Sequence, residues 1–183
     1  MNKIIFLFAC LFSLTCGYGQ KYFSKNAMIR FHSDSPLEKI EGVNSTSTTV
    51  LDATSGKMEF AALNNAFVFE KALMQEHFNE NYMESTKFPK TVFKGVINEI
   101  KAVKFTVPGT YKVTVTGEMS IHDVTKTLTA PVEFIVDAKG LHGTAKFIVK
   151  CSDYNIEIPS VVKENISNDV DINVKVDYNI LSQ

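Results

Sequence analysis

The chain has 183 residues and a formal net charge of −1, with acidic and basic residues interspersed along its length. This balance leaves no basic surface for nucleic acid and no polybasic patch for anionic lipid. A chain of this length has room for one domain with a sizeable core and is short for two.

The N-terminal residues have the pattern of a secretory signal peptide. Lys3 supplies a positive charge, residues 4–14 are almost continuously apolar, and Gly17 and Gly19 are small residues before a cleavage site. The apolar run is shorter than the roughly 20 residues that a membrane-spanning helix needs. We therefore expect residues 1–19 to be removed and the protein to be exported, either periplasmic or secreted.

Cleavage after Gly19 leaves residues 20–183, a single expected domain of 164 residues. Cys10 and Cys16 leave with the signal, so Cys151 is the one cysteine of the mature chain and an intramolecular disulfide is excluded. Cys16 fits a lipoprotein signal poorly, because the residues before it lack the small side chain expected at that cut.

The first part of the mature chain has scattered strand signals. Residues 27–33 indicate a first strand, and residues 48–52 are β-branched enough for a second strand. Between them, residues 37–47 look loop-like, with a brief pairing of residues 38–42 left open. A turn then leads into another strand at residues 57–63, after which Phe67–Phe69 continues the alternation.

A helical pattern interrupts the strands after residue 72. Apolar residues from Leu73 to Tyr82 recur at spacings of three and four, which makes one side of a short helix apolar. Pro89 lacks a backbone donor, so the helix should end by about Lys87 and a strand can follow. This amphipathic insertion is a candidate lid or plug.

Long stretches of the second half alternate apolar and polar residues with period two. They are residues 111–119, 128–136, 141–151 and 170–180. Tight reversals separate them and leave no room for crossover helices, so the sheet should be antiparallel. Long strands with one apolar face must stack or roll up, and closure removes exposed edges. The expected fold is all-β with a short helical insertion, an antiparallel barrel of about eight strands.

The residues by themselves leave two alternatives for the barrel interior. An interior of about eight strands is just wide enough either to be filled by side chains or to hold one small ligand. Phenylalanine-rich strands suit both alternatives equally. A transmembrane barrel is disfavoured, since such barrels carry aromatic girdles at both interfaces whereas these strands mostly end in Asp, Lys, Ser or Thr.

Two motifs resemble the YceI-like family. Residues 75–78 with 88–93 are similar to its Arg-Asp-x-His-Leu and Phe/Tyr-Pro-x-x-x-Phe patterns, and residues 117–126 to its Gly-x-Leu-x-Ile-x-Gly-x-Thr-Lys pattern. Gln75 stands where the family usually has Arg, and Asp123 where it has Gly. The resemblance implies an extended, lipocalin-like barrel that holds a long isoprenoid chain in its apolar interior.

The leading hypothesis is therefore a secreted or periplasmic binding protein whose partner is an apolar, lipid-like small molecule, an isoprenoid-type lipid or a quinone tail. A solid-core envelope interaction module without a lipid ligand is the alternative, a lipid-acting hydrolase or isomerase is weaker, and a homodimer stays open. The expected ligand-binding residues are Phe60, Phe67, Phe69, Phe78, Tyr82, Phe88, Phe93, Val113, Val115, Phe134, Phe147 and Val174.

The helical insertion should close one end of the barrel. We expect Phe78, Tyr82 and Phe88 to turn inward against Phe67, Phe69 and Phe93, while Glu76, Glu80 and Glu84 face water.

Motifs for catalysis and for metal binding are sparse. His32, His77, His122 and His142 never fall at a metal-ligand spacing. Neighbours in a helix point about 100° apart, so Glu76 and His77 cannot easily address one substrate atom. We expect no catalytic residues, no metal and no cofactor.

Overall fold

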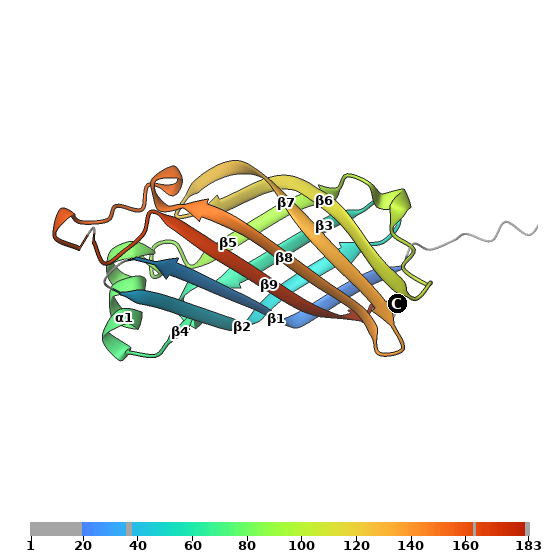
Figure 1. Ribbon diagram of the computed structural model, residues 1–183, viewed down its shortest axis with the longest axis horizontal. Helices are drawn as coiled ribbons and strands as arrows, with labels where there is room; N and C mark the ends of the chain where they lie inside the picture. The colour runs from blue at the N-terminus through green and yellow to red at the C-terminus, as the bar shows by residue number, and fades with distance from the viewer. Residues whose placement is uncertain (1–19, 36–37, 163, 182–183) are drawn as a thin grey trace, which may run out of the picture.

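The computed structural model describes residues 20–35, 38–162 and 164–181. The expected signal peptide, residues 1–19, lies outside these described residues. The described residues form an extended antiparallel β-barrel with a short helical segment at one end (Figure 1), so the expected fold class is confirmed. None of the described helices is long and apolar enough to cross a membrane.

Eight long strands, counted over the described residues, build the wall. They are β1 (Lys21–Asp34), β2 (Lys39–Asp52), β3 (Lys57–Leu63), β5 (Lys90–Ile97), β6 (Gly109–Ile121), β7 (Val124–Asp137), β8 (Gly140–Lys150) and β9 (Asp169–Ile180), with the short β4 (Val68–Phe69) at the edge of β2. The shorter elements are η1 (Asn64–Ala66), α1 (Ala72–His77), η2 (Phe78–Tyr82), η3 (Ile100–Ala102), η4 (Cys151–Tyr154) and η5 (Ser160–Val162). The sheet order is β1-β9-β8-β7-β6-β5-β3-β2-β4, and pairing of β1 with β2 closes the barrel.

The hairpin between β6 and β7 has the tight turn that the sequence indicates. Ile121 pairs with Val124, and His122 and Asp123 between them have φ values of +49° and +61°. Two consecutive residues with positive φ define a type I′ turn, whose twist matches that of the flanking strands. Asp123 therefore occupies a position that glycine adopts more easily.

The prediction of a loop at residues 37–47 is wrong, because β2 is continuous from Lys39 to Asp52. The misleading signal is a set of small polar side chains that point inward. Asn44 is fully buried, donating to the Leu63 carbonyl at 3.0 Å and accepting from the Ser47 hydroxyl at 3.2 Å. A buried polar group whose hydrogen bonds are satisfied can face a core, and it hides the usual alternation.

The helical segment ends at Tyr82, before the limit of about Lys87 that Pro89 predicts. Its second half is a turn of π-helix, and Glu84 follows with a positive φ of 42°, which stops helical propagation. Asn79 stabilises the residues that follow the helical segment, because its side-chain oxygen accepts from the Ser85 hydroxyl at 2.7 Å.

The interior divides into a filled half and a hollow half. In the filled half, Leu51 and Phe134 are completely buried, and Phe105 from the β5–β6 connection packs against Phe134 with ring centroids 6.1 Å apart. Burial raises the pKa of Tyr178 in this half to about 12. The hollow half lies toward α1, where β7 and β8 separate beyond their ladder of Val132–Asp137 with Gly140–Ala145 (Figure 1).

Candidate functional site

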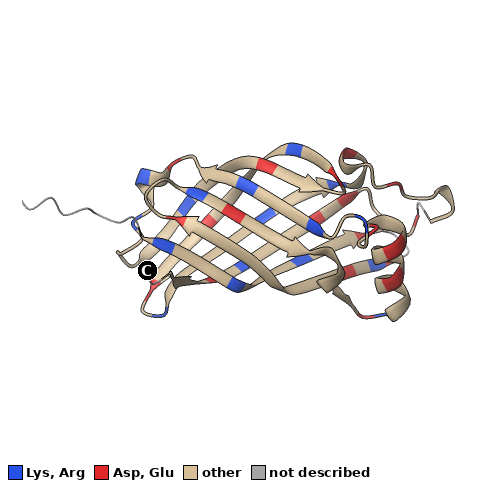
Figure 2. Ribbon diagram, turned by 180° about the vertical axis from the view of Figure 1, so that it is seen from behind, with Lys and Arg blue, Asp and Glu red and all other residues tan. Residues whose placement is uncertain are grey.

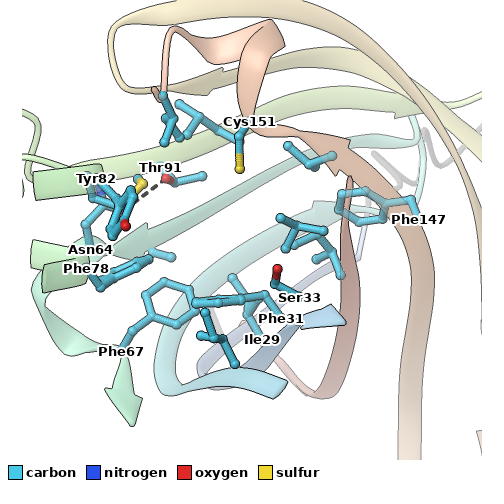
Figure 3. A pocket seen from close by; sticks show the side chains of 18 of the residues that line it. Ile29, Phe31, Ser33, Asn64, Phe67, Phe78, Tyr82, Thr91, Phe147 and Cys151 are labelled. Atoms are coloured by element: carbon cyan, nitrogen blue, oxygen red, sulfur yellow. Dashed lines mark hydrogen bonds between the residues drawn. The ribbon is translucent and has the colours of Figure 1, made fainter. Parts of the chain in front are cut away.

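The hollow half of the barrel is a cavity of about 560 Å³, within the usual range for small-molecule sites. Its walls come from inward-facing residues of the strands, from the helical segment α1–η2, and from the connection after η4 (Figure 3). Aliphatic and aromatic side chains dominate these walls, because the strands alternate with their apolar face inward.

Most of the residues that we expected to bind a ligand line this cavity. They are Phe60, Phe67, Phe69, Phe78, Tyr82, Phe93, Val115, Phe147 and Val174. They belong to strands, to the helical segment or, for Phe67, to the connection between η1 and β4. Whether they contact a ligand remains a prediction.

Val113 and Phe134 do not line the cavity, because they belong to the filled half of the barrel. Their strands alternate as predicted, so both side chains do face inward. The prediction was wrong about where these two residues lie along the barrel axis. Phe105 and the residues around η3 fill this half of the barrel and occupy the space beside Phe134. No periodicity in the strands themselves reveals which end a connecting segment will fill.

An aromatic cluster joins the helical segment to the barrel wall. The Phe31 ring lies 5.5 Å from that of Phe67, 5.6 Å from that of Phe69 and 5.4 Å from that of Phe78, measured between centroids. Gly42 on the neighbouring strand makes room, since a Cβ there would collide with the Phe31 ring. Phe31 was missing from the predicted set, although its alternation with Ile29 in β1 was the available signal.

Phe88 was expected to turn into the barrel, and the structure places it elsewhere. Its ring contacts the His122 ring, with centroids 4.5 Å apart, and the Lys87 ammonium lies 4.6 Å from its centroid. Residues 85–87 form a turn in which the Lys87 and Phe88 amides donate to the Glu84 carbonyl at 2.8 and 2.9 Å, and Phe88 packs against the β6–β7 turn instead of entering the cavity.

Glu84 was expected to face water, and it instead binds His122. The His122 Nε2 atom lies 2.8 Å from a Glu84 carboxylate oxygen, and its Nδ1 atom lies 3.2 Å from the Tyr154 carbonyl oxygen. This one ring therefore links the end of the helical segment, the β6–β7 turn and η4. The other two predictions of exposure fit the structure, in which Glu76 and Glu80 are exposed.

Uncharged polar groups interrupt the apolar wall near the helical segment. The Asn64 side chain accepts from the Thr91 hydroxyl at 2.9 Å and donates to the Phe88 carbonyl at 2.7 Å, which satisfies it. Burial raises the pKa of Tyr82 and also that of the Cys151 thiol, so both groups stay neutral near pH 7. Figure 3 shows Tyr82 and Cys151 on the cavity wall.

One charged pair lies at the cavity rim. The Lys71 ammonium lies 3.1 Å from a Glu38 carboxylate oxygen, and both residues line the cavity. The sequence does not predict this pair, because 33 positions separate its members. Among the described residues, no group of three or more His, Cys, Asp or Glu side chains is arranged to hold a metal ion.

The chain matches a known domain family and several solved structures. The YceI-like domain model matches residues 24–178. A polyisoprenoid binding domain from Saccharophagus degradans, implicated in plant cell wall breakdown, matches with a TM-score of 0.77 at 12% identity, covering 90% of this chain and 100% of that one.

Two further solved structures share the fold. Burkholderia cenocepacia BcnA matches with a TM-score of 0.67 at 15% identity, over 81% of this chain and 94% of that one. The Campylobacter jejuni YCEI protein matches with a TM-score of 0.59 at 16% identity, over 78% and 85%. No curated protein matches the chain.

Proposed function

Because the chain belongs to the YceI-like domain family, we propose that it is an exported binding protein that holds an extended apolar ligand inside the barrel. The ligand would be an isoprenoid-type lipid or the tail of a quinone. The proposal assigns the protein a carrier or storage role and no catalytic step.

The observation that carries this proposal is the hollow apolar half of the barrel. A chain threaded into it would lie between side chains such as Phe60, Phe147 and Val174. Each buried CH2 contributes about 0.8 kcal/mol, so about ten buried carbons contribute about 8 kcal/mol. That is comparable with the roughly 4–15 kcal/mol that association costs in lost freedom. The solid-core alternative does not explain why this half is left hollow.

The choice of an isoprenoid chain rests on family membership and on one relative. The matching domain from Saccharophagus degradans is described as polyisoprenoid binding, and it shares the whole of its length with this chain. The aromatic cluster around Phe31 supports a linear apolar ligand, because it covers one end of the cavity with apolar surface.

Organic extraction of the purified mature protein, followed by mass spectrometry, tests the proposal. We expect a hydrocarbon-tailed lipid at close to one molecule per protein. Ala145→Phe would fill the cavity from β8 and should abolish recovery of the lipid, whereas Lys146→Phe, at the next position and exposed, should leave it unchanged. Recovery of no lipid from several preparations, together with no binding of added isoprenoids, would favour the solid-core interaction module.

A further inference from the structure

The cavity lining contains two oppositely charged side chains, which determine its electrostatic character. Among the described residues that line it, Glu38 and Lys71 carry formal charges, and these two neutralise one another at 3.1 Å. A phosphate or diphosphate group brought to this rim would have to compete with the Glu38 carboxylate for the Lys71 ammonium. His77 also lines the cavity.

The one arginine in the sequence lies away from the cavity. Arg30 is on the outer face of β1, its side chain is 48% exposed, and its guanidinium lies 3.5 Å from the Glu41 carboxylate. Arginine is the residue best suited to bidentate recognition of phosphate, because its planar donors match two phosphate oxygens. The cavity therefore lacks the side chain that most often binds a phosphorylated group.

The helical segment beside the rim adds a negative field. Residues 72–82 contain two glutamates, Glu76 and Glu80, and no lysine or arginine, which gives a formal net charge of −2 with histidine counted as uncharged. Figure 2 shows the acidic residues gathered on this helical end of the molecule. An anionic group held at the rim would be repelled by this field, and more strongly at low ionic strength.

Tyr82 offers the cavity an uncharged hydrogen-bonding group. It lies on η2 and lines the cavity (Figure 3), and its phenol stays protonated because burial raises its pKa. A neutral phenol both donates and accepts hydrogen bonds, so it can pair with a hydroxyl or a carbonyl oxygen. Two polar side chains of the lining are already engaged, since Asn64 accepts from the Thr91 hydroxyl and donates to the Phe88 carbonyl.

We propose that the cavity selects apolar chains with an uncharged polar end, an alcohol or a ring carbonyl, over chains of the same length that end in phosphate or diphosphate, and that Tyr82 pairs with that end. This inference rests on the proposed function. It extends that proposal by naming the chemical class of the head group and the residue that recognises it.

Competition of matched C20 isoprenoids against a fluorescent apolar probe, delivered from cyclodextrin, tests the selectivity. The ligands are geranylgeraniol, geranylgeranyl diphosphate and the corresponding hydrocarbon. We expect the alcohol to bind about tenfold or more tightly than the diphosphate, a difference of about 1.4 kcal/mol per tenfold. The ratio of alcohol affinity to diphosphate affinity should fall when the ionic strength rises from about 0.01 M to about 1 M, because salt screens the rim charges.

Three variants test which residues cause the selectivity. Tyr82→Phe should weaken binding of the alcohol several-fold and leave that of the hydrocarbon unchanged. Glu38→Gln leaves Lys71 unpaired and should strengthen binding of the diphosphate with no change for the alcohol. Arg30→Gln, on the outer face, is the matched control and should change neither. Thermal melts establish that each variant is folded.

The possible failures are distinguishable. Diphosphate binding as tightly as the alcohol at low ionic strength would overturn the selectivity, and this comparison needs no variant. An unchanged ratio of alcohol to hydrocarbon affinity in Tyr82→Phe would overturn the assignment of Tyr82. If all three ligands, including the hydrocarbon, fail to compete with the probe, the proposed function itself is refuted, and this inference is refuted with it.

Discussion

The Phe78 ring stacks on the Phe31 ring, with their centroids 5.4 Å apart and their planes at 21°. Phe78 begins η2 in the helical segment, whereas Phe31 belongs to β1, so this contact fastens the segment to the wall it covers (Figure 1). Offset aromatic pairs of this kind contribute about 0.5–1.5 kcal/mol beyond the area that they bury. The aromatic cluster is thus one of the contacts that hold the segment to the barrel.

Phe78→Ala tests this attachment. Phe78 is half-buried, so we expect the free energy of unfolding to fall by about 1–3 kcal/mol, less than the roughly 3–5 kcal/mol of a fully buried phenylalanine. Dissociation of a bound apolar probe should become faster, because the segment is no longer anchored. Chemical denaturation and stopped-flow fluorescence measure the two effects. Val68→Ala, at an exposed position, is the control, and equal behaviour of both variants would contradict an anchoring role.

Gly117→Ala tests the close approach of β5 and β6. Gly117 pairs with Gly95, and a Cβ on Gly117 would collide with the Lys94 carbonyl oxygen and the Gly95 Cα. Backbone atoms cannot move aside as a flexible side chain can, so we expect a loss of about 1–3 kcal/mol in the free energy of unfolding. Gly109→Ala faces only the Tyr111 hydroxyl at 3.2 Å and should change stability by less than about 0.5 kcal/mol. Equal unfolding midpoints in urea for the two variants would refute this explanation.

Asp123→Gly should stabilise the protein. Asp123 has a φ of +61° in the β6–β7 turn, where glycine has no steric penalty. We expect the free energy of unfolding to rise by about 0.5–1 kcal/mol, as measured by thermal or urea unfolding. Asp123→Ala is the control, since alanine still carries the Cβ that makes a positive φ unfavourable; it should be no more stable than the unaltered protein. A destabilised Asp123→Gly would show that the aspartate has another role.

His142 should make stability depend on pH. Hydrogen bonding to the Asp177 carboxylate is the main cause that raises the pKa of His142, and Asp137 at the end of β7 adds to it. A raised folded-state pKa means that the stabilisation is complete below the unfolded value of about 6.5 and is lost as the pH rises through the folded pKa. Asp177→Asn should lower the pKa of His142 in an NMR titration and flatten the loss of stability above about pH 6.5.

The control for this prediction is Asp171→Asn, which removes the same charge from the same strand. Asp171 pairs with His32 and with Ile148 in the neighbouring ladders and not with His142. It should therefore leave the titration of His142 unchanged. A fall in the pKa of His142 that is equally large in both variants would mean that overall charge, rather than the Asp177 carboxylate, holds the proton.

The alternation of apolar and polar residues along β6, β7, β8 and β9, with the tight reversals between them, was sufficient to predict these strands and their antiparallel pairing. Period two is a property of the extended backbone itself, and the reversals between strands carry their own signals, such as His122–Asp123. The helical interruption after residue 72 was equally visible, because helical spacing differs from strand spacing. Motif resemblance identified the family from the same local stretches.

The division of the barrel into a filled and a hollow half was decided only by the tertiary structure. A strand's alternation says which face is inward and says nothing of position along the barrel axis, so Val113 was predicted at the cavity and lies in the filled half. The insertion of Phe105 from a connecting segment closes that end, and the register of β7 against β8 leaves the other end open. The pairs Glu84–His122 and Lys71–Glu38 likewise join segments distant in sequence. Such contacts depend on how the whole sheet closes, because no local pattern encodes which loops meet at its ends.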